Sequence, residues 1–445
     1  MDWVKLLIAW DVLKNGKYEW DDWMEAMTLQ LQLSMGVIGR RFVGVGKQMR
    51  QDNREGLLKP AVSHILINSR RKKSTEPRDK VFALCGLFKE LEIPFPAPDY
   101  SRSVEAIYRE AAISCINNDK SLLSLYFVQS DRRRDGLSSW VPDLSEYGWG
   151  QTDSRHGFGL ERFAASSRCS AKWSFSEDGT ALVLFGKIVD TVIFRADPLP
   201  GMEKTQELLQ SFNQSIAGGI PSYARSLWRN EDLGGVDPDF QIFLDNIFRS
   251  YTTLKGWAEI SRWSDYPTGE STRRAFQRTL VNDLHKGNAE AAENHAFDDW
   301  YNVIMLGDLD ITERAVRRSG SASAIPKTPW ERELFLHKVM EQMPQEKIVY
   351  IAISNCHFHT TASGFSEKRC FFFTENNYFG TIADPLPVSL EPGDKIAIVR
   401  GLELPLALRP IDGGYKLLTH VYVHGIMYGE AWPQSEESLE EIVLL

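Results

Sequence analysis

The chain has 445 residues and a mass of 50.7 kDa, too long for one small core, and predicts about two to four cooperative regions. Its net charge of -9 and pI near 5.6 argue against generic nucleic-acid binding, which needs a basic field to displace counterions from phosphate. Five scattered cysteines without CxxC spacing argue against a disulfide framework and favour a reducing compartment.

Targeting and anchoring segments are not recognisable in the sequence. Residues 1–5 lack the basic region and cleavage site of a signal peptide. The longest apolar runs, such as 396–399, are far shorter than the roughly 20 residues that span a bilayer. We therefore expect a soluble cytosolic or nuclear protein, cytoplasmic by default, with no membrane partner. The short basic runs 70–73 and 132–134 are expected to be solvated charges.

The N-terminal region is expected to be mostly helical. Apolar residues recur at helical spacing over residues 6–13 and again over 20–35. Ser74 or Thr75 is the expected cap of a further helix, with Pro77 in its first turn. Its C-terminal end is expected near Gly86.

Prolines separate this region from the next helix. They exclude helix over residues 93–98 and predict an extended linker. Ser101 is the expected cap of a helix whose apolar residues share one face. Residues 137–144 are expected to be irregular and anchored by Trp140. The expected buried face of the helix consists of Val104, Ile107, Tyr108, Ala111 and Ala112.

The hydrophobic period changes to two after Ser170, which predicts strands. Residues 173–188 fit a hairpin closed at Asp178-Gly179. Helical patterning returns over residues 201–345. The strands expected after that are 348–351, 370–373, 395–399 and 415–423, with a turn at 391–394.

These patterns predict a mixed α+β fold with a C-terminal antiparallel β region. The expected domain limits are 1–95 for a helical region, 96–165 for a helix with an irregular Trp-anchored segment, 166–200 for a β hairpin, 201–345 for a helical region and 346–445 for the β region with its tail.

Three stretches, in order, resemble the fungal heterokaryon-incompatibility (HET) domain family. Residues 75–87 (TEPRDKVFALCGL), followed by 99–101 (DYS), resemble the closing motif of that domain. Residues 139–143 (SWVPD) resemble the segment that follows it. The C-terminal series is similar to the β region common in these proteins, and it comprises 372–374 (FFT), 393–394 (GD), 408–410 (LRP) and 422–430 (YVHGIMYGE).

The resemblance spans about residues 64 to 432 and leaves out the first half of the family's domain. That half usually carries "SYxWG"-like and "WIDALCINQ"-like strands and is described as similar to TIR folds. Neither pattern occurs here, so residues 1–95 are interpreted as a helical remnant of the HET domain. Self-association, death signalling or nucleotide chemistry of that half does not carry over.

Polar residues inside otherwise apolar motifs are the candidate catalytic groups. A histidine beside a carboxylate can exchange protons, and an arginine can hold an anion. The alternative is structural: Asp99 would cap the helix near Ser101, and Arg409 would form a buried pair with Glu430. The candidates are Asp99, Asp143, Arg409, His424 and Glu430.

Cys356-His357-Phe358-His359 is the local group with metal-ligand residue types. In a strand, His357 and His359 face the same side, as some metal sites require. A third ligand is not evident nearby, so a weak metal site and a chance pair of histidines are both open. No cofactor is expected, because GxSxG, GxxxxGK[ST] and GxGxxG motifs in the required context are missing from the sequence.

Two functions from different classes follow. The first is a HET-like protein of fungal non-self recognition or regulation, acting through a protein partner or self-association. The second is a cofactor-independent acid/base enzyme of fungal secondary metabolism, with a small-molecule ligand between the helical region and the β region. A third interpretation is an inactive remnant that modulates full-length relatives.

Overall fold

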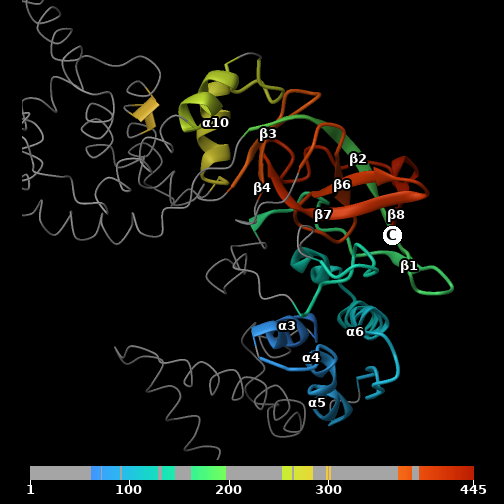
Figure 1. Cartoon of the computed structure of the whole chain (residues 1–445). Helices are drawn as coiled ribbons and strands as arrows, with labels where there is room; N and C mark the ends of the chain where they lie inside the picture. Colours follow the sequence, from blue (N-terminus) through green and yellow to red (C-terminus); the bar gives the residue numbers. More distant parts are fainter. Residues whose placement is uncertain are drawn as a thin grey trace, which may run out of the picture. The chain divides into compact units, whose positions relative to one another are not determined.

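The computed structural model describes residues 62–71, 73–90, 93–128, 133–145, 162–196, 253–262, 265–283, 297–298, 300–301, 369–382 and 390–445. Within these ranges it contains helices and an almost wholly antiparallel sheet (Figure 1), which confirms the α+β class. The chain divides into two compact units, Met1–Ser124 and Leu125–Leu445. The five-part division expected from the sequence stays a prediction. None of the described helices combines enough length with enough apolar character to cross a bilayer.

The first unit is organised around helix α3 (Val62–Asn68) and helix α6 (Val104–Asp119). The Asp119 carboxylate accepts hydrogen bonds from the Val62 and Ser63 amides at 2.8 and 2.9 Å, and from the Ser63 hydroxyl at 2.7 Å. Amides in the first turn of a helix have no partner within the helix. The last residue of α6 therefore caps α3.

Short helical segments complete this unit: η2 (Ser69–Arg71), α4 (Asp79–Phe82) and α5 (Cys85–Glu90), while η3 (Leu123–Phe127) spans the boundary between the units. The Lys80 ammonium donates to the backbone carbonyls of Ser69 and Arg70 at 3.4 and 3.1 Å. Burial, followed by the nearby charge of Arg70, lowers the pKa of Lys80. This lysine stabilises the carbonyls at the end of the α3–η2 segment.

The expected helix starts in this unit are wrong by a few residues. Helix α4 begins after Arg78, whose side chain does not cap it. The residues before Arg78 form turns instead of helix, because the Asp79 and Lys80 amides donate to the carbonyls of Glu76 and Pro77. Gly86 lies in the first turn of α5. The cap of α6 is Ser103, whose hydroxyl accepts from the Ala106 amide at 3.2 Å, whereas the expected cap was Ser101.

Two other expectations for this region are confirmed. Residues 93–98 contain no helix. The expected face of α6 is buried, and Cys115 and Ile116 extend it.

The second unit contains a closed ring of six strands. In ring order these are β2 (Leu182–Arg195), β3 (Phe371–Thr374), β4 (Phe379–Ile382), β7 (Gly414–Val423), β6 (Leu406–Ile411) and β5 (Lys395–Val399). Strand β2 closes the ring because it pairs with β3 through its last residues and with β5 through residues 186–191. The result is a β-barrel whose first strand comes from far upstream in the chain.

Two further strands pair with the first half of β2. Strand β1 (Trp173–Phe175) forms the predicted hairpin with β2, and Gly179 in its turn has φ of +67°. Strand β8 (Glu440–Leu444) pairs with residues 182–186 on β2, and Leu444 also pairs with Tyr415 of β7. The irregular segment anchored by Trp140 is confirmed as well, since its indole N–H donates to the Thr180 carbonyl at 3.0 Å.

Strand β3 separates two hydrophobic cores, because alternate side chains on a strand point to opposite faces. Cys370 and Phe372 belong to the core that contains Ile396, Ile398 and other ring residues. Phe371 and Phe373 belong to a second core with helix α10 (Thr272–Leu280). Its aromatic members outside β3 are Trp257, Tyr266, Phe276, Phe297, Trp300, Tyr301 and Phe379.

Gly380 of β4 allows the closest packing in this wall. A Cβ at this position would lie 2.2 Å from the Phe372 ring, which covers the glycine on the neighbouring strand. We predict that Gly380→Ala lowers the free energy of unfolding by about 1–3 kcal/mol, because Phe372 must leave its position. Chemical denaturation monitored by tryptophan fluorescence measures the change.

Gly256→Ala is the matched control in the same unit. Among the described residues, apart from its chain neighbours and its own helix backbone, no atom lies within 4 Å of the added Cβ, so the substitution is expected to be neutral or slightly stabilising. Equal destabilisation by both substitutions would contradict the packing described for Gly380.

Candidate functional site

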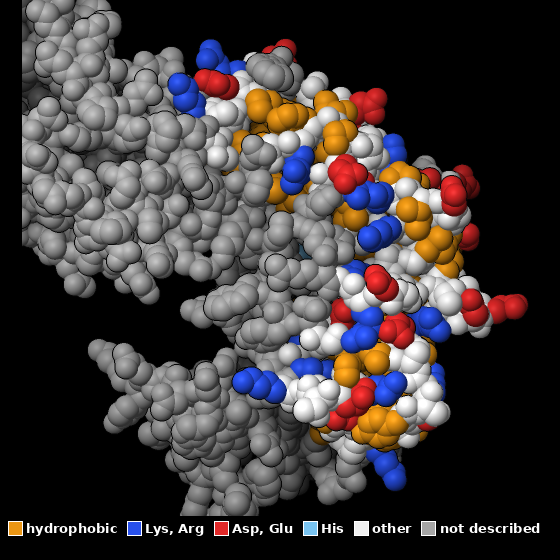
Figure 2. Space-filling model, in the orientation of Figure 1, with side chains coloured by type: hydrophobic (Ala, Val, Ile, Leu, Met, Phe, Trp, Pro, Cys, Tyr) orange, Lys and Arg blue, Asp and Glu red, His pale blue; other side chains and the backbone are white. Residues whose placement is uncertain are grey.

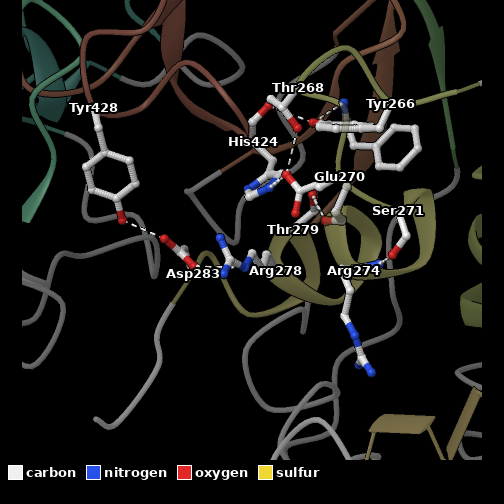
Figure 3. A network of polar contacts seen from close by, with 12 residues as sticks. Tyr266, Thr268, Glu270, Ser271, Arg274, Arg278, Thr279, Asp283, His424 and Tyr428 are labelled. Carbon is white, nitrogen blue, oxygen red and sulfur yellow. Dashed lines mark hydrogen bonds and ion pairs between the residues drawn. The ribbon is translucent and has the colours of Figure 1, made fainter. Parts of the chain in front are cut away.

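His424 lies just after β7 and joins that strand to the segment that precedes α10 (Figure 3). Its Nε2 is 2.7 Å from Oε1 of Glu270, and its Nδ1 is 2.9 Å from the Tyr422 hydroxyl. The Glu270 carboxylate also accepts from the Thr268 hydroxyl at 2.9 Å. These contacts form a continuous hydroxyl–imidazole–carboxylate chain, which we call the Tyr422–His424–Glu270 chain.

Local sequence on both elements places this chain. Ser271 caps α10 by accepting from the Arg274 amide at 3.3 Å, so Glu270 is held directly before the helix. Gly425 has φ of +92°, and a Cβ there would lie 2.7 Å from the Thr268 methyl carbon. Glycine therefore lets the backbone after His424 approach the α10 segment.

Tyr266 attaches the same backbone from the other side. Its hydroxyl donates to the His424 carbonyl at 2.6 Å and accepts from the Phe379 amide at 3.3 Å. The Tyr266 hydroxyl thus connects the aromatic core to strand β4 and to the backbone of His424. Burial raises the pKa of Tyr266, which keeps this hydroxyl protonated.

A second polar group lies after α10. The Tyr428 hydroxyl donates to Oδ2 of Asp283 at 2.6 Å, and Nε of Arg278 lies 3.9 Å from Oδ1 of the same carboxylate. Figure 3 shows Arg278 beside Asp283. Burial, followed by the bond to Asp283, raises the pKa of Tyr428.

The protonation states in the chain follow from its partners. Burial alone would raise the pKa of Glu270, but hydrogen bonds from His424 and Thr268 and the charge of Arg278 hold it below its ordinary value of 4.5. An ionised carboxylate only accepts, so Nε2 of His424 carries a hydrogen. Burial raises the pKa of Tyr422, which keeps its hydroxyl protonated beside Nδ1 of His424.

The exposure of the chain runs opposite to that of a hydrolytic triad. In such triads the carboxylate is buried and the hydroxyl faces the substrate. Here Tyr422 is only 2% exposed, whereas the Glu270 side chain is 26% exposed. The arrangement links a buried phenol to an ionised carboxylate through one imidazole, and it attaches α10 to the end of β7.

The other expected catalytic residues do not join this group. Asp99 is in the first unit, where it accepts from the Ser101 amide at 2.9 Å and so shapes the turn before α6 rather than capping the helix. Asp143 is buried and accepts from the Arg134 and Ser145 amides, both at 2.9 Å. Both carboxylates thus make local backbone bonds.

In the described part of the chain, Arg409 and Glu430 do not form the expected pair, and each binds other groups. Nε of Arg409 is 2.9 Å from Oδ1 of Asp394, and its NH1 is 3.4 Å from Glu391. Glu430 is exposed and accepts from the Tyr428 amide at 2.7 Å. Arg409 therefore links β6 to the turn before β5, and Glu430 shapes the loop after β7.

Arg133, within the basic run 132–134, differs from the expectation of solvated charges. It is half-buried and donates to the carbonyls of Ser138, Ser139 and Val141, the last at 2.9 Å. Burial lowers the pKa of Arg133 to about 10, although the charge of Asp143 opposes the shift. This arginine supports the irregular segment around Trp140.

The proposed metal ligands His357 and His359 lie outside the described residues. Within the part of the chain that the structure describes, no group of three or more His, Cys, Asp or Glu residues is arranged to hold a metal ion. The weak metal prediction therefore stays a prediction.

Glu270 and Tyr422 are the members of the chain that the sequence interpretation did not name as candidates. Ser271 before an amphipathic run signals a helix start and places Glu270 beside the cap. The sequence does not signal that this carboxylate meets His424, because 154 positions separate them.

Comparison with known families supports part of the resemblance. Residues 276–442 match the family model of the Het-6 beta-barrel domain, a family related to heterokaryon incompatibility. The matched range includes five of the six ring strands and His424, whereas β2 and Glu270 precede it. No curated protein and no solved structure matches the chain.

Glu270→Gln tests the electrostatics of the chain. Because the pKa of Glu270 is lowered by folding, its stabilising effect is complete above pH 4.5 and is lost as the pH falls through the folded-state value. We expect the variant to lose about 1.5–3 kcal/mol at pH 7, the range for hydrogen bonds to charged groups. Urea unfolding at a series of pH values should show this difference narrowing below pH 4.5.

Glu259→Gln is the control, because its ion pair with Lys255 is on the surface and the Glu259 side chain is 55% exposed. A change below about 0.5 kcal/mol is expected at every pH. A Glu270→Gln curve parallel to that of the native protein down to acid pH would contradict an ionised, bonded Glu270.

Proposed function

We propose that this protein acts in heterokaryon incompatibility, as a protein of fungal non-self recognition that works through protein contacts. The match of residues 276–442 to the Het-6 beta-barrel domain carries this proposal. The barrel supports it, because a closed ring has no free sheet edges and offers a rigid surface for contacts.

The polar residues of the motifs also favour a contact role. Asp143 and Arg409 bind backbone or charged groups within their own unit, and this accounts for them as scaffold. Buried polar residues inside motifs are normally hydrogen-bonded in this way. The motifs therefore build the barrel and its supports rather than an open reactive site.

Apolar side chains exposed on the second unit are candidates for the contact surface. Ile193 and Phe194 are consecutive on β2 and are 50% and 40% exposed. Ile411, at the end of β6, is 43% exposed. Hydrophobic side chains gather in more than one place on the face drawn in Figure 2. Exposed apolar patches on soluble domains commonly mark interaction sites.

The proposal predicts an effect on fused cells. Two strains that differ only at this gene, one with the native copy and one with a sequence-divergent copy, are allowed to fuse, and survival is scored with a vital dye. We expect fused cells to die with the native copy and to survive when it carries Ile193→Asp with Phe194→Asp, because charges on this surface oppose an apolar contact.

Glu177→Lys, at an exposed charged position outside these apolar side chains, is the control for a general effect of a change in surface charge, and circular dichroism checks that both variants fold. Normal survival of fused cells with the native copy would contradict the proposed role. If fused cells survive with the control variant as well, the effect is a general one of surface charge and the contact is not at Ile193 and Phe194.

Acid/base catalysis is a second candidate, and the Tyr422–His424–Glu270 chain is the observation that favours it. An imidazole between a hydroxyl and a carboxylate is the arrangement that general acid/base catalysis uses. The buried phenol is the obstacle to this candidate, since a substrate must reach the chain from the Glu270 end.

Tyr422→Phe separates the two candidates because it removes one hydroxyl and keeps the ring. The structural role predicts a loss of about 1 kcal/mol of stability and no change in ligand binding. The measurements are native mass spectrometry for a bound small molecule and thermal shift against fractions of fungal extract. A fraction that raises the melting temperature of the native protein by several degrees, with turnover lost in Tyr422→Phe, would support the enzyme instead.

A further inference from the structure

Strand β8 lies outside the ring that closes the barrel. The six strands from β2 round to β5 pair in a closed circuit, and β8 adds to this circuit by pairing with β2 and β7. Its pairing covers residues 182–186 of β2 and Tyr415 of β7, which together we call the β8 position. Removing β8 therefore leaves every pairing within the ring in place.

The β8 position fits the backbone of this strand closely. A Cβ at Gly414 would lie 2.5 Å from the Val443 carbonyl oxygen, and one at Gly186 would lie 3.1 Å from the Ile442 side chain. Two glycines thus allow β8 to approach both neighbouring strands. Ile442 and Leu444 are fully buried, and the Glu440 carboxylate accepts from the Ile188 amide at 2.8 Å.

The irregular segment around Trp140 completes the position. The Ser139 amide donates to the Leu445 carbonyl, and the Ser139 hydroxyl accepts from the Leu417 amide at 3.0 Å. The Leu445 amide donates to the Tyr415 carbonyl at 3.0 Å. The backbone bonds fix the register and direction of a strand, and the buried Ile442 and Leu444 side chains make the sequence of β8 a segment that fits the position.

The segment before β8 is exposed and weakly held, in contrast to the loop before it. Ile426 and Met427 are buried and Trp432 packs against the barrel core. Residues 434–438 are all exposed, and their ion pair joins Arg400 to Glu436, whose side chain is 73% exposed. Such a surface pair contributes at most about 1 kcal/mol. Local opening is therefore expected at this connector, residues 433–439, with the barrel still folded.

We propose that a second copy of this chain is the partner for the β8 position, and that two copies associate by exchanging β8. Exchange restores every bond of β8 in the other copy, so its free-energy cost lies mainly in association and in reorienting the connector. Seven extended residues reach about 23 Å, which allows β8 to enter a neighbouring barrel. The inference rests on the proposed contact role and adds a contact between copies that is separate from Ile193 and Phe194.

Cysteine crosslinking of the full chain tests the exchange. Val183 and Val443 are directly opposite in the β2–β8 register, and both are half-buried, so cysteine is tolerated at either position. Full-length Val183→Cys and Val443→Cys chains, one carrying a larger affinity tag, are mixed over a concentration series and treated with a short bis-maleimide. Exchange predicts a crosslinked dimer of mixed mass, because the two cysteines become neighbours only across copies.

The control mixture pairs Val183→Cys with Glu437→Cys, which lies in the exposed connector outside the register. Register-paired cysteines have an effective concentration near millimolar, so the test pair should crosslink faster than this control, whose second cysteine lies outside the register. Each single variant alone and the native chain measure the background from the native cysteines.

The Val183→Cys/Val443→Cys double variant makes a negative result interpretable. A crosslink within one chain shows that β8 occupies its position and that both cysteines react. Crosslinking within the double variant, with no mixed dimer above the control pair at any concentration, would overturn the exchange. If fused-cell death is retained in that case, the proposed function stands and this contact does not. A mixed dimer together with normal survival of fused cells would support the exchange of β8 and contradict the proposed function.

Discussion

The pairing of β2 with β5 and β3 is the constraint on which the second unit depends. In the ring, β5 pairs with β6 on one side and β3 pairs with β4 on one side, and β2 pairs with the other side of each. Without β2, both strands would therefore expose one unpaired edge. Unpaired edges leave backbone groups unsatisfied and invite pairing with other chains. A strand that precedes the matched Het-6 beta-barrel range by about 80 positions removes both edges at once.

The closed ring also explains why the α10 segment and His424 lie together. Strand β3 has its apolar side chains on both faces, so its outer face requires a second core, which α10 and its aromatic neighbours supply. Glu270 stands at the start of α10 and His424 at the end of β7, next to β4 in the ring. The Tyr422–His424–Glu270 chain therefore lies where the outer core meets the barrel, and its buried end is the phenol.

The sequence predicts local elements better than their closure. A period-two pattern identifies the β1–β2 hairpin, apolar runs identify β3, β5 and β7, and one apolar face identifies α6, because burial follows residue type. The short strands β4 and β6 contain Gly380 and Pro410 and give weak strand signals. The circuit through β2 depends on contacts between residues about 200 positions apart, and periodicity carries no information on these.

The same limit applies to the candidate site. His424 is recognisable as a polar residue within an apolar motif, but its carboxylate partner is not Glu430, six positions away. Asp394 and Arg133 are likewise ordinary charged residues in the sequence, and only the fold pairs Asp394 with Arg409 and bonds Arg133 to the Trp140 segment. Sequence reasoning identifies which residue types can pair, and topology decides which of them do.

Amide hydrogen exchange of the intact chain, resolved to single residues, tests the closure by β2 most directly. The Gly393 amide donates to the Val192 carbonyl at 2.8 Å and the Arg400 amide donates to the Phe185 carbonyl at 2.9 Å, one at each end of β5. Closure predicts that both amides exchange as slowly as the amides between β6 and β7. Rapid exchange of Gly393 and Arg400, with the β6–β7 amides still protected, would show an open β5 edge and contradict the closed barrel.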